Sequence, residues 1–508
     1  MSNQKLVSLL LTVVVAVNLI VLVPGCTPGV PTTTTEAETT AETTAETTAE
    51  TTAEEAQPFK GVTITVAERA GVCADVLIKL APDWEKKTGG KLVVVAEPDA
   101  TYYSKLIMEF KSKSGAFDAV DLRAMWLGDS ISGGYLMPLD DFIADQNSKQ
   151  PGWYDDYLNN NSKCSWGGKV YGMDSDGDEL SLYFRKDIFE NADEKAAFKA
   201  KYGYELSPDM TWDQYLDVAQ FFTRKAGETL AGETLAEPFY GCVELCMGWA
   251  MPWFMLNRYA SIDGPKPQLF ASKDMQPLVS SENGVKSLEN FVEALKYCPP
   301  GTLGMEYMDA TGMFLNGKAA MIVMWPDIPR WASDPNVVAS GKVGFAPSPG
   351  KLVDGQIVHR DLLAAGTAWA IPADSKNAEA AWDFIVWWGS LDNSIKVLSD
   401  FSGGYDPYTQ SQMDSPELVQ LMVDGADYMK NHANSFKMGW MDLRIPGAES
   451  MYAALGINVG KALSGESTPQ QAMDQTVIDW NSVIDDLGRD NLLKLYLESI
   501  ASEGTPER

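Results

Sequence analysis

The feature that most constrains the fold is a regular alternation of strand and helix patterns that begins at Phe59. Three short apolar runs are typical of buried strands: GVTITVAE (61–68), KLVVVAE (91–97) and FDAVDLRA (117–124). Two amphipathic segments of helical period separate them: CADVLIKLAPDWEKKTG (73–89) and YYSKLIMEFKSKSG (102–115). This alternation favours an α/β fold with a mainly parallel, doubly wound sheet, whose ligands bind beyond the carboxyl ends of the strands. Residues 67–71 and 125–129 occupy two such ends.

The rest of the chain continues as an α/β protein. An extended stretch is predicted over residues 180–189, followed by a helix that begins after Thr211 as its N-cap. A GETLA duplication in residues 227–236 indicates a lengthened surface loop. Further helices are predicted over 281–298 and 377–391, and the tail is predicted to form two helices interrupted at SGEST (464–468).

Length and charge limit the function. A chain of 508 residues exceeds what one hydrophobic core usually supports, so two lobes are expected. The formal net charge of −30 argues against binding to nucleic acid or to anionic lipid, because both are negatively charged. With only two histidines, His359 and His432, nucleophilic catalysis assisted by histidine and histidine-based zinc sites are not expected. We expect no catalytic residue, no metal and no cofactor.

The N-terminus has the pattern of a secretory signal. Lys5 precedes a long apolar run that ends at Val23-Pro24-Gly25-Cys26. Gly25-Cys26 resembles the lipobox of bacterial lipoproteins, which implies a signal peptide over 1–26 and lipidation of Cys26. The alternative is an uncleaved transmembrane anchor. Both place the protein outside the cytoplasm, on the outer face of the cell membrane, or in the periplasm if an outer membrane is present.

Residues 27–58 repeat an E-T-T-A unit and have no hydrophobic face to bury, so we expect a disordered spacer. Five cysteines remain after Cys26, which allows one or two disulfides with at least one thiol left over: Cys73, Cys164, Cys242, Cys246 and Cys298. Cys242 and Cys246 would be close enough to bridge in a helix, or they are small buried side chains.

The acidic stretch MDSDGDEL (173–180) admits a calcium loop, the rim of a pocket for a hydroxyl-rich ligand, or a plain turn. An EF-hand loop needs glycine at position 6 and glutamate at position 12. Counted from Asp174, these positions hold Glu179 and Arg185, so the register fails. The sequence therefore favours the rim of a ligand pocket over a calcium loop. Asp178 is best placed to face the ligand and Glu179 is the second choice, whereas Asp174 and Asp176 shape the turn.

Six segments in order carry a resemblance to a known family: WLGDSISGGYLMPL (126–139), LSLYFRKDIF (180–189), TWDQY (211–215), MFLNGKAAM (313–321) with the MWPDIPRW that follows, AWAIPADSKNAEAAWDFI (368–385) and ALSGESTPQQAMD (462–474). Their order and spacing over residues 59–500 resemble the extracellular solute-binding proteins of carbohydrate ABC transporters, in the branch that includes maltose-binding protein.

The resemblance implies a periplasmic-binding-protein-like fold of two doubly wound α/β lobes, joined by hinge segments around a ligand cleft. Lobe 1 would comprise 59–181 and 366–415, and lobe 2 would comprise 182–365 and 416–508. The chain would cross between lobes near Ser181, near Gly366 and near residue 415. The lobes would close on a small carbohydrate, and the closed form would dock on ABC permease subunits. We expect a monomer.

Sugars offer hydroxyls to carboxylates and amides, and apolar C–H faces to aromatic rings. Several of the 15 tryptophans fall on predicted loops: Trp126, Trp249, Trp253, Trp325, Trp331, Trp369 and Trp440. By the resemblance, Trp126 and Asp129 would be the stacking and hydrogen-bonding pair of the first lobe, and Trp325 the platform of the second. The other candidate ligand residues are Glu68, Arg69, Asp178, Glu179, Trp249, Trp253, Asp327, Asp361, Trp369, Tyr405, Trp440 and Arg444. For each tryptophan the alternative is a structural role in the core. For Arg444 the alternative is an ion pair with a neighbouring acidic residue.

Two rival functions remain open. A secreted glycoside hydrolase would also need aromatic platforms and paired carboxylates. A binder of peptides, polyamines or other non-sugar solutes such as polyols is the second rival, because tryptophan faces also attract cations.

Overall fold

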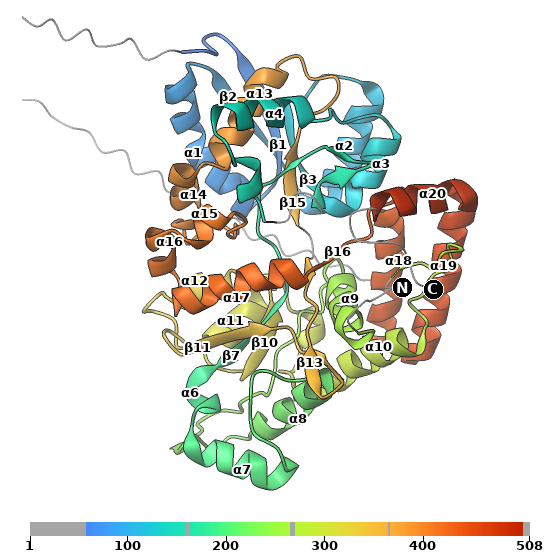
Figure 1. Ribbon diagram of the computed structural model, residues 1–508. Helices are drawn as coiled ribbons and strands as arrows, with labels where there is room; N and C mark the ends of the chain where they lie inside the picture. The colour runs from blue at the N-terminus through green and yellow to red at the C-terminus, as the bar shows by residue number, and fades with distance from the viewer. Residues whose placement is uncertain (1–56, 159–162, 265–269, 364–365, 501–508) are drawn as a thin grey trace, which may run out of the picture. The chain divides into compact units, whose positions relative to one another are not determined.

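The computed structural model describes residues 57–158, 163–264, 270–363 and 366–500 (Figure 1). A five-stranded sheet has the order β2-β1-β3-β15-β6. Its strands are β1 (Thr63–Arg69), β2 (Lys91–Glu97), β3 (Ala119–Arg123), β6 (Met173–Asp174) and β15 (Thr367–Ala370). β1 is parallel to β2 and to β3, as the alternating pattern predicts, whereas β15 is antiparallel to β3 and β6.

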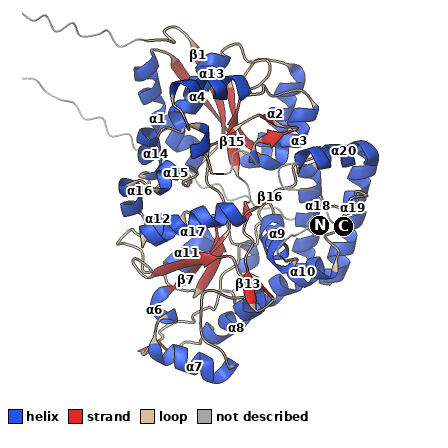
Figure 2. Ribbon diagram, viewed as in Figure 1, coloured by secondary structure: helices blue, strands red, loops and turns tan. Residues whose placement is uncertain are grey.

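Helices cover both faces of this sheet (Figures 1 and 2). Alternate residues of β1 point to opposite faces: Ile64 and Val66 join the buried cluster that contains Leu77 of α1, whereas Ala67 joins the cluster that contains Leu106 of α2. The helices around the sheet are α1 (Val72–Thr88), α2 (Asp99–Ser112), α3 (Leu127–Ser132), α4 (Asp140–Lys149), α13 (Ala378–Trp388) and α14 (Leu391–Leu398).

A second sheet of three strands has the order β10-β7-β11, and both of its pairings are antiparallel. The strands are β7 (Ser181–Arg185), β10 (Met321–Met324) and β11 (Val343–Pro347). The helices between and after these strands are α6 (Lys186–Phe189), α7 (Ala192–Tyr202), α8 (Trp212–Phe222), α9 (Met251–Ile262), α10 (Glu282–Ala294), α11 (Tyr307–Leu315), α12 (Ile328–Trp331) and α17 (Gly425–Met438). The C-terminal helices are α18 (Ala448–Leu463), α19 (Pro469–Leu487) and α20 (Arg489–Ser499).

Short elements connect these parts. Two-stranded sheets pair β4 (Ser165–Trp166) with β5 (Lys169–Val170), β8 (Thr229–Leu230) with β9 (Glu233–Thr234), β12 (Lys351–Val353) with β13 (Gln356–Val358), and β14 (Leu362–Leu363) with β16 (Trp440–Met441). Single helical turns are η1 (Ala124–Trp126), η2 (Tyr154–Asp156), η3 (Leu295–Tyr297) and η4 (Thr302–Gly304). Two further short helices are α15 (Gln410–Met413) and α16 (Pro416–Leu421).

Local sequence signals account for most element boundaries. Thr211 caps α8 by accepting a hydrogen bond from the Gln214 amide at 3.2 Å, which confirms the predicted N-cap, and Gly89 ends α1 in the left-handed region at φ 74°. The extended stretch predicted over 180–189 is wrong in its second half, because Lys186–Phe189 forms α6. The GETLA duplication forms the β8–β9 hairpin.

The predicted signal peptide, Cys26 and nearly all of the predicted spacer lie outside the described residues. Within the described part of the chain, none of the helices has the length and apolar character needed to cross a membrane. All five cysteines from Cys73 onward are buried and free. A Cys242–Cys246 bridge is not formed, because residues 242–246 are not helical; the Cys242 Sγ lies 3.6 Å from the Sγ of Cys298 instead.

Candidate ligand-binding site

Segments far apart in the sequence converge at the carboxyl ends of β1, β3 and β10. β1 ends in Glu68-Arg69, and β3 ends in Arg123. Trp325 follows β10 directly, and the segment between β6 and β7 contains residues 175–180. This is the edge at which ligands bind in open α/β sheets.

Four tryptophans cluster at this edge. Trp249 stacks on Trp325 with ring centroids 5.7 Å apart and an interplanar angle of 20°. Trp253 meets both rings edge-on, at 5.7 Å and 6.2 Å. Trp126, Trp253 and Trp325 are buried, whereas 41% of Trp249 is exposed. Trp249 and Trp325 thus form a two-ring wall with one accessible member, which suits stacking on an apolar ligand face.

The guanidinium of Arg123 lies across this cluster, 5.2 Å from the ring of Trp126, 5.8 Å from that of Trp249 and 5.5 Å from that of Trp253. Its Nη2 donates to Asp99 Oδ1 at 2.6 Å. Its Nε is enclosed and has no acceptor among the described residues. A buried donor of this kind costs free energy unless a ligand atom accepts from it.

Glu68 and Arg69 form an ion network at the end of β1. The Arg69 Nε donates to Asp121 Oδ2 at 2.7 Å, and the Tyr405 hydroxyl donates to Glu68 Oε2 at 3.1 Å. Burial, with the charge of Asp121, raises the pKa of Glu68 well above its usual value. Three of the predicted ligand residues therefore come together here.

Asp327 is placed by a second network. The Arg330 Nη2 donates to Asp327 Oδ1 at 2.6 Å, and the Tyr307 hydroxyl donates to Asp327 Oδ2 at 2.5 Å. Arg330 also donates to the carbonyls of Gly403 and Tyr405, at 2.7 Å and 3.1 Å. Burial raises the pKa of Asp327, although the charge of Arg330 opposes that effect.

Asp178 is 9% exposed and makes no hydrogen bond with the described residues. Burial raises its pKa to about 7, against the lowering effect of Arg69. Asp176 and Asp406 lie beside it, and one carboxylate oxygen of each of the three lies within 4.8 Å of the others. A hydroxyl-rich solute would find acceptors here, and Asp178 is the most exposed of the three.

Glu179 and Asp361 are fully buried and belong to internal networks. Glu179 accepts from the Ser181 hydroxyl at 2.8 Å and lies 3.2 Å from His432 Nδ1. Asp361 Oδ1 accepts from the Ser348 amide at 2.8 Å. The Glu179 carboxylate therefore has partners within the protein already, whereas Asp361 is held through Oδ1 and its enclosed Oδ2 has no hydrogen-bond partner among the described residues.

The remaining predicted residues have neighbours of their own. Trp126 Nε1 donates to Glu449 Oε2 at 2.7 Å, and Asp129 accepts from the Tyr103 hydroxyl at 3.0 Å. Trp369 is packed edge-on against Phe384 and Trp388 within the core. Trp440 lies in β16, beside β14. Arg444 is buried and donates to the Ser499 carbonyl at 2.6 Å.

The prediction that the tryptophans lie on loops is wrong for most of them. Trp126 is in η1, Trp253 in α9, Trp331 in α12, Trp369 in β15 and Trp440 in β16; only Trp249 and Trp325 lie outside helices and strands. Sequence reasoning also missed several residues that the fold brings to this edge: Asp121, Arg123, Asp176, Tyr307, Arg330 and Asp406. For Arg123 the signal was present, because it stands at the carboxyl end of a predicted strand, whereas Asp121 lies in the middle of that strand.

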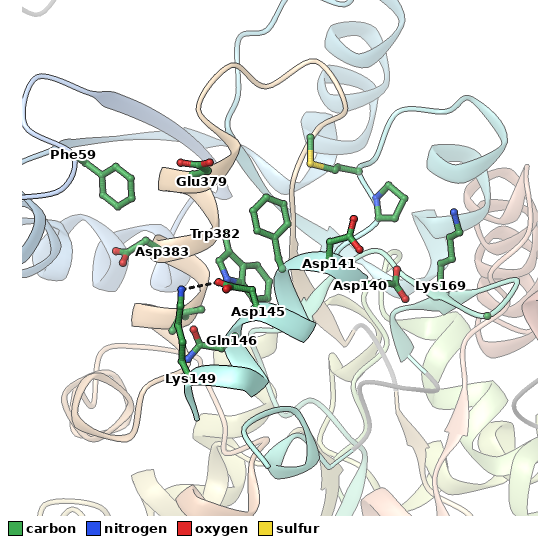
Figure 3. A pocket seen from close by; sticks show the side chains of 15 residues that line it. Phe59, Asp140, Asp141, Asp145, Gln146, Lys149, Lys169, Glu379, Trp382 and Asp383 are labelled. Atoms are coloured by element: carbon green, nitrogen blue, oxygen red, sulfur yellow. Dashed lines mark hydrogen bonds and ion pairs between the residues drawn. The ribbon is translucent and has the colours of Figure 1, made fainter. Parts of the chain in front are cut away.

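A surface groove of about 1090 Å³ lies elsewhere, between α4 and α13 (Figure 3). Phe59 and Trp382 line it together with several carboxylates, among them Asp141 and Asp145. None of the predicted ligand residues lines this groove. It shares no residue with the group at the carboxyl ends of β1, β3 and β10, which is called the strand-end cluster and comprises Glu68, Arg69, Arg123, Asp178, Trp249, Trp325 and Asp327.

A profile of the bacterial extracellular solute-binding protein family matches residues 74–393. The chain belongs to this family. Family members of this kind bind solutes rather than transform them, and the family is extracellular. The family match and the strand-end cluster are independent observations that agree on a solute-binding role.

This solute-binding protein has relatives with known ligands. It is 23% identical over 378 residues to the erythritol/L-threitol-binding protein of Mycolicibacterium smegmatis, covering 73% of this chain and 75% of the relative. A solute-binding protein of Agrobacterium radiobacter K84, solved with ribitol, is 25% identical with a TM-score of 0.67, covering 84% of this chain and 100% of that structure. Maltose-bound MalE3 of T. maritima is 20% identical with a TM-score of 0.65, covering 83% and 100%. These likenesses place the fold among two-lobed periplasmic binding proteins, as the sequence predicts.

Proposed function

We propose that this protein captures a polyol or a small sugar at the strand-end cluster and delivers it to an ABC permease. The main support for this proposal is that the Trp249–Trp325 wall lies at the same edge as Asp178. Asp178 is a buried carboxylate that has no hydrogen-bond donor among the described residues. Aromatic rings bind the C–H faces of such solutes, and carboxylates accept from their hydroxyls. Arg123 supplies a donor beside the same wall.

The two-lobe division predicted from the sequence is part of this proposal. The chain passes from the five-stranded sheet to the three-stranded sheet between Asp174 and Ser181, and it returns between Pro347 and Thr367. Both passages support crossings near Ser181 and Gly366. Lobe 1 would be 59–181 with 366–415, and lobe 2 would be 182–365 with 416–508.

Contacts between the proposed lobes support capture by closure. Arg123 of lobe 1 lies over Trp249 and Trp253 of lobe 2, and Arg330 of lobe 2 donates to two carbonyls of the 403–405 segment of lobe 1. A solute that contacts both lobes makes its full set of contacts only when the lobes are closed. It therefore binds the closed form more tightly than the open form, and this difference in affinity drives the hinge motion.

The cellular setting follows from the N-terminal pattern. We propose that Cys26 carries a lipid, that the E-T-T-A spacer holds the folded part off the membrane, and that the protein works as a monomer without a cofactor. Catalysis is not part of the proposal, because the family is one of solute binders.

A thermal-shift screen of the full-length protein tests the function. Ribitol, erythritol, D-sorbitol and maltose are compared with spermidine and with a short peptide. A solute that binds only the folded state raises the melting temperature. We expect at least one polyol or sugar to raise it in a saturable way. A response to spermidine or the peptide alone would contradict the proposal, and so would release of sugars from glycans incubated with the protein.

A further inference from the structure

Asp176, Asp178 and Asp406 form a compact group, the carboxylate trio, at the strand-end cluster. One carboxylate oxygen of each residue lies within 4.8 Å of the other two. Asp176 and Asp406 are each 2% exposed. Asp176 and Asp178 come from the segment between β6 and β7, whereas Asp406 comes from a loop more than two hundred residues later. Only the fold brings the three together.

Backbone contacts hold the trio in place. The Asp406 amide donates to Asp176 Oδ1 at 2.8 Å, and the Gly177 amide donates to the Asp406 carbonyl at 3.2 Å. Gly177 allows this close approach, since a Cβ at that position would lie 2.0 Å from the Pro407 carbonyl oxygen. The two segments are therefore fixed against each other, with three carboxylates at their junction.

Burial, together with the charges of neighbouring carboxylates, raises the pKa of Asp176 and Asp406 well above the usual value, and burial raises the pKa of Asp178 to about 7. In its ionised form the trio has no cationic partner. No basic side chain of the described residues lies within 4.0 Å of its carboxylate oxygens. Asp406 Oδ2 is enclosed and accepts no hydrogen bond from the described residues. Buried carboxylates are rare without a compensating charge, because burial removes the water that stabilises them.

The nearby basic groups are committed elsewhere. Arg69 pairs with Asp121 at 2.7 Å, and Arg330 pairs with Asp327 at 2.6 Å. Lys163 donates to the backbone carbonyl of Asp176 at 2.8 Å and lies 3.6 Å from Asp174. These cations moderate the local field, but each has its own carboxylate, so none of them forms an ion pair with the trio when it is ionised.

The spacing of the trio fits a single bound cation. Ca²⁺ takes oxygen ligands at about 2.3–2.6 Å, so oxygens up to about 5 Å apart can share one ion. An ammonium group with three N–H donors at about 2.9 Å from their acceptors reaches a similar spread. Mg²⁺ bonds at about 2.1 Å, and the trio would have to contract around it.

We propose that the carboxylate trio is a cation subsite of the solute cleft, filled by Ca²⁺ or by a protonated amine on the solute. If the cation is an amine on the solute, the inference rests on the proposed function. If the cation is Ca²⁺, the subsite can be filled without a solute. The site is not an EF-hand, because its third ligand comes from residue 406 rather than from the same loop.

A bound water is the simplest competing explanation. A cavity of about 10 Å³ borders Asp406 and Tyr408, which is room for about one water molecule. A water there would donate a hydrogen bond to Asp406 but would not compensate the negative charge of the trio in its ionised form. If a cation fills the site, adding its salt stabilises the protein in a saturable way, whereas a bound water predicts no such effect.

The metal arm uses the full-length protein after treatment with a chelator. CaCl₂ alone is titrated by calorimetry, with MgCl₂ and with NaCl at equal ionic strength as comparisons. We expect saturable binding of Ca²⁺ and a higher melting temperature, with Mg²⁺ at least about tenfold weaker and no effect of NaCl.

The amine arm compares D-glucamine with D-sorbitol, which share a carbon skeleton and differ in one amine in place of a hydroxyl. If the solute supplies the cation, D-glucamine binds at least about tenfold more tightly, because its ammonium replaces a neutral group beside the trio.

Asp406→Asn tests both arms, since it keeps the shape of the side chain and removes its charge. We expect it to weaken the cation effect at least about tenfold while leaving the melting temperature of the cation-free protein no lower, because it removes like-charge repulsion. Asp392→Asn, an exposed position in the first turn of α14, is the matched control and should change nothing.

The outcomes separate this inference from the proposed function. A Ca²⁺ effect or an amine preference that Asp406→Asn abolishes supports the cation subsite. The inference is overturned if neither appears, or if the effect persists in Asp406→Asn. If ribitol, D-sorbitol or maltose still stabilises the protein in that case, the proposed function stands without the subsite.

Discussion

Carboxylates that are buried with little compensation are the most unusual residues of this protein. Asp361 is one of them, with its Oδ1 bonded to the Ser348 amide and the carboxylate of Glu179 near enough to act on its charge. Burial first, and then the charge of Glu179, raises the pKa of Asp361 to about 8. Such a group couples the stability of the fold to pH.

The direction in which the stability changes with pH follows from the number of protons bound in the native and the unfolded states. Between the unfolded value of 3.8 and about 8, the native protein keeps a proton on Asp361 that the unfolded chain has lost, so the free energy of unfolding falls as the pH rises through this window. Asp361→Asn keeps the acceptor for Ser348 and removes the titration. We expect a shallower fall of the melting temperature between about pH 4 and about pH 8. An unchanged slope, equal to that of Asp392→Asn, would show that Asp361 does not titrate in this range.

At the scale of elements, the site depends on how the 403–407 segment docks on the segment between β6 and β7. Gly177 is the contact point, because a Cβ there would meet the Pro407 carbonyl oxygen at 2.0 Å. His432 of α17 adds a second contact, with its Nε2 2.8 Å from the same oxygen. The docking brings Asp406 and Tyr405 to the ends of β1 and β6.

Gly177→Ala should therefore separate the two segments. We expect a loss of about 1–3 kcal/mol in the free energy of unfolding, together with weaker solute binding, because backbone atoms must move to relieve the overlap. Denaturant unfolding measures the first effect and calorimetry the second. Gly304→Ala is the control, since a Cβ at Gly304 meets no atom within 4 Å. Equal stability of the two variants would contradict this account of the docking.

The elements themselves are predictable from the sequence, because apolar periodicity and caps such as Thr211 act over a few residues. The site is predictable only in part. Arg69 stands at a predicted strand end, Asp178 precedes the extended stretch predicted over 180–189, and Trp325 is expected from the family resemblance; the fold brings all three to one edge. Asp406 and Arg330 reach the same edge through contacts with segments distant in sequence, which no local pattern contains. Trp369 has the residue type of a platform, but its strand is buried on both faces, so the indole packs in the core.

At the scale of the whole folded region, function requires the two proposed lobes to share one solute. The ring wall of Trp249 and Trp325 belongs to lobe 2, whereas Asp178 and Arg123 belong to lobe 1. The uncompensated groups on the lobe 1 side are those that a solute would satisfy: the Arg123 Nε and the Asp178 carboxylate. A bound solute would therefore contact both lobes only in the closed form, so its binding free energy would favour closure.

The most direct measurement is calorimetric titration of the full-length protein and of Asp178→Asn with ribitol, D-sorbitol and maltose. We expect saturable binding of at least one solute to the unaltered protein, and an affinity at least about tenfold lower in Asp178→Asn, because the amide keeps the volume but loses the charged acceptor. The variant should keep its melting temperature, since Asp178 makes no hydrogen bond with the described residues. Equal affinity in the two proteins, or no binding of any of the three solutes, would contradict the account.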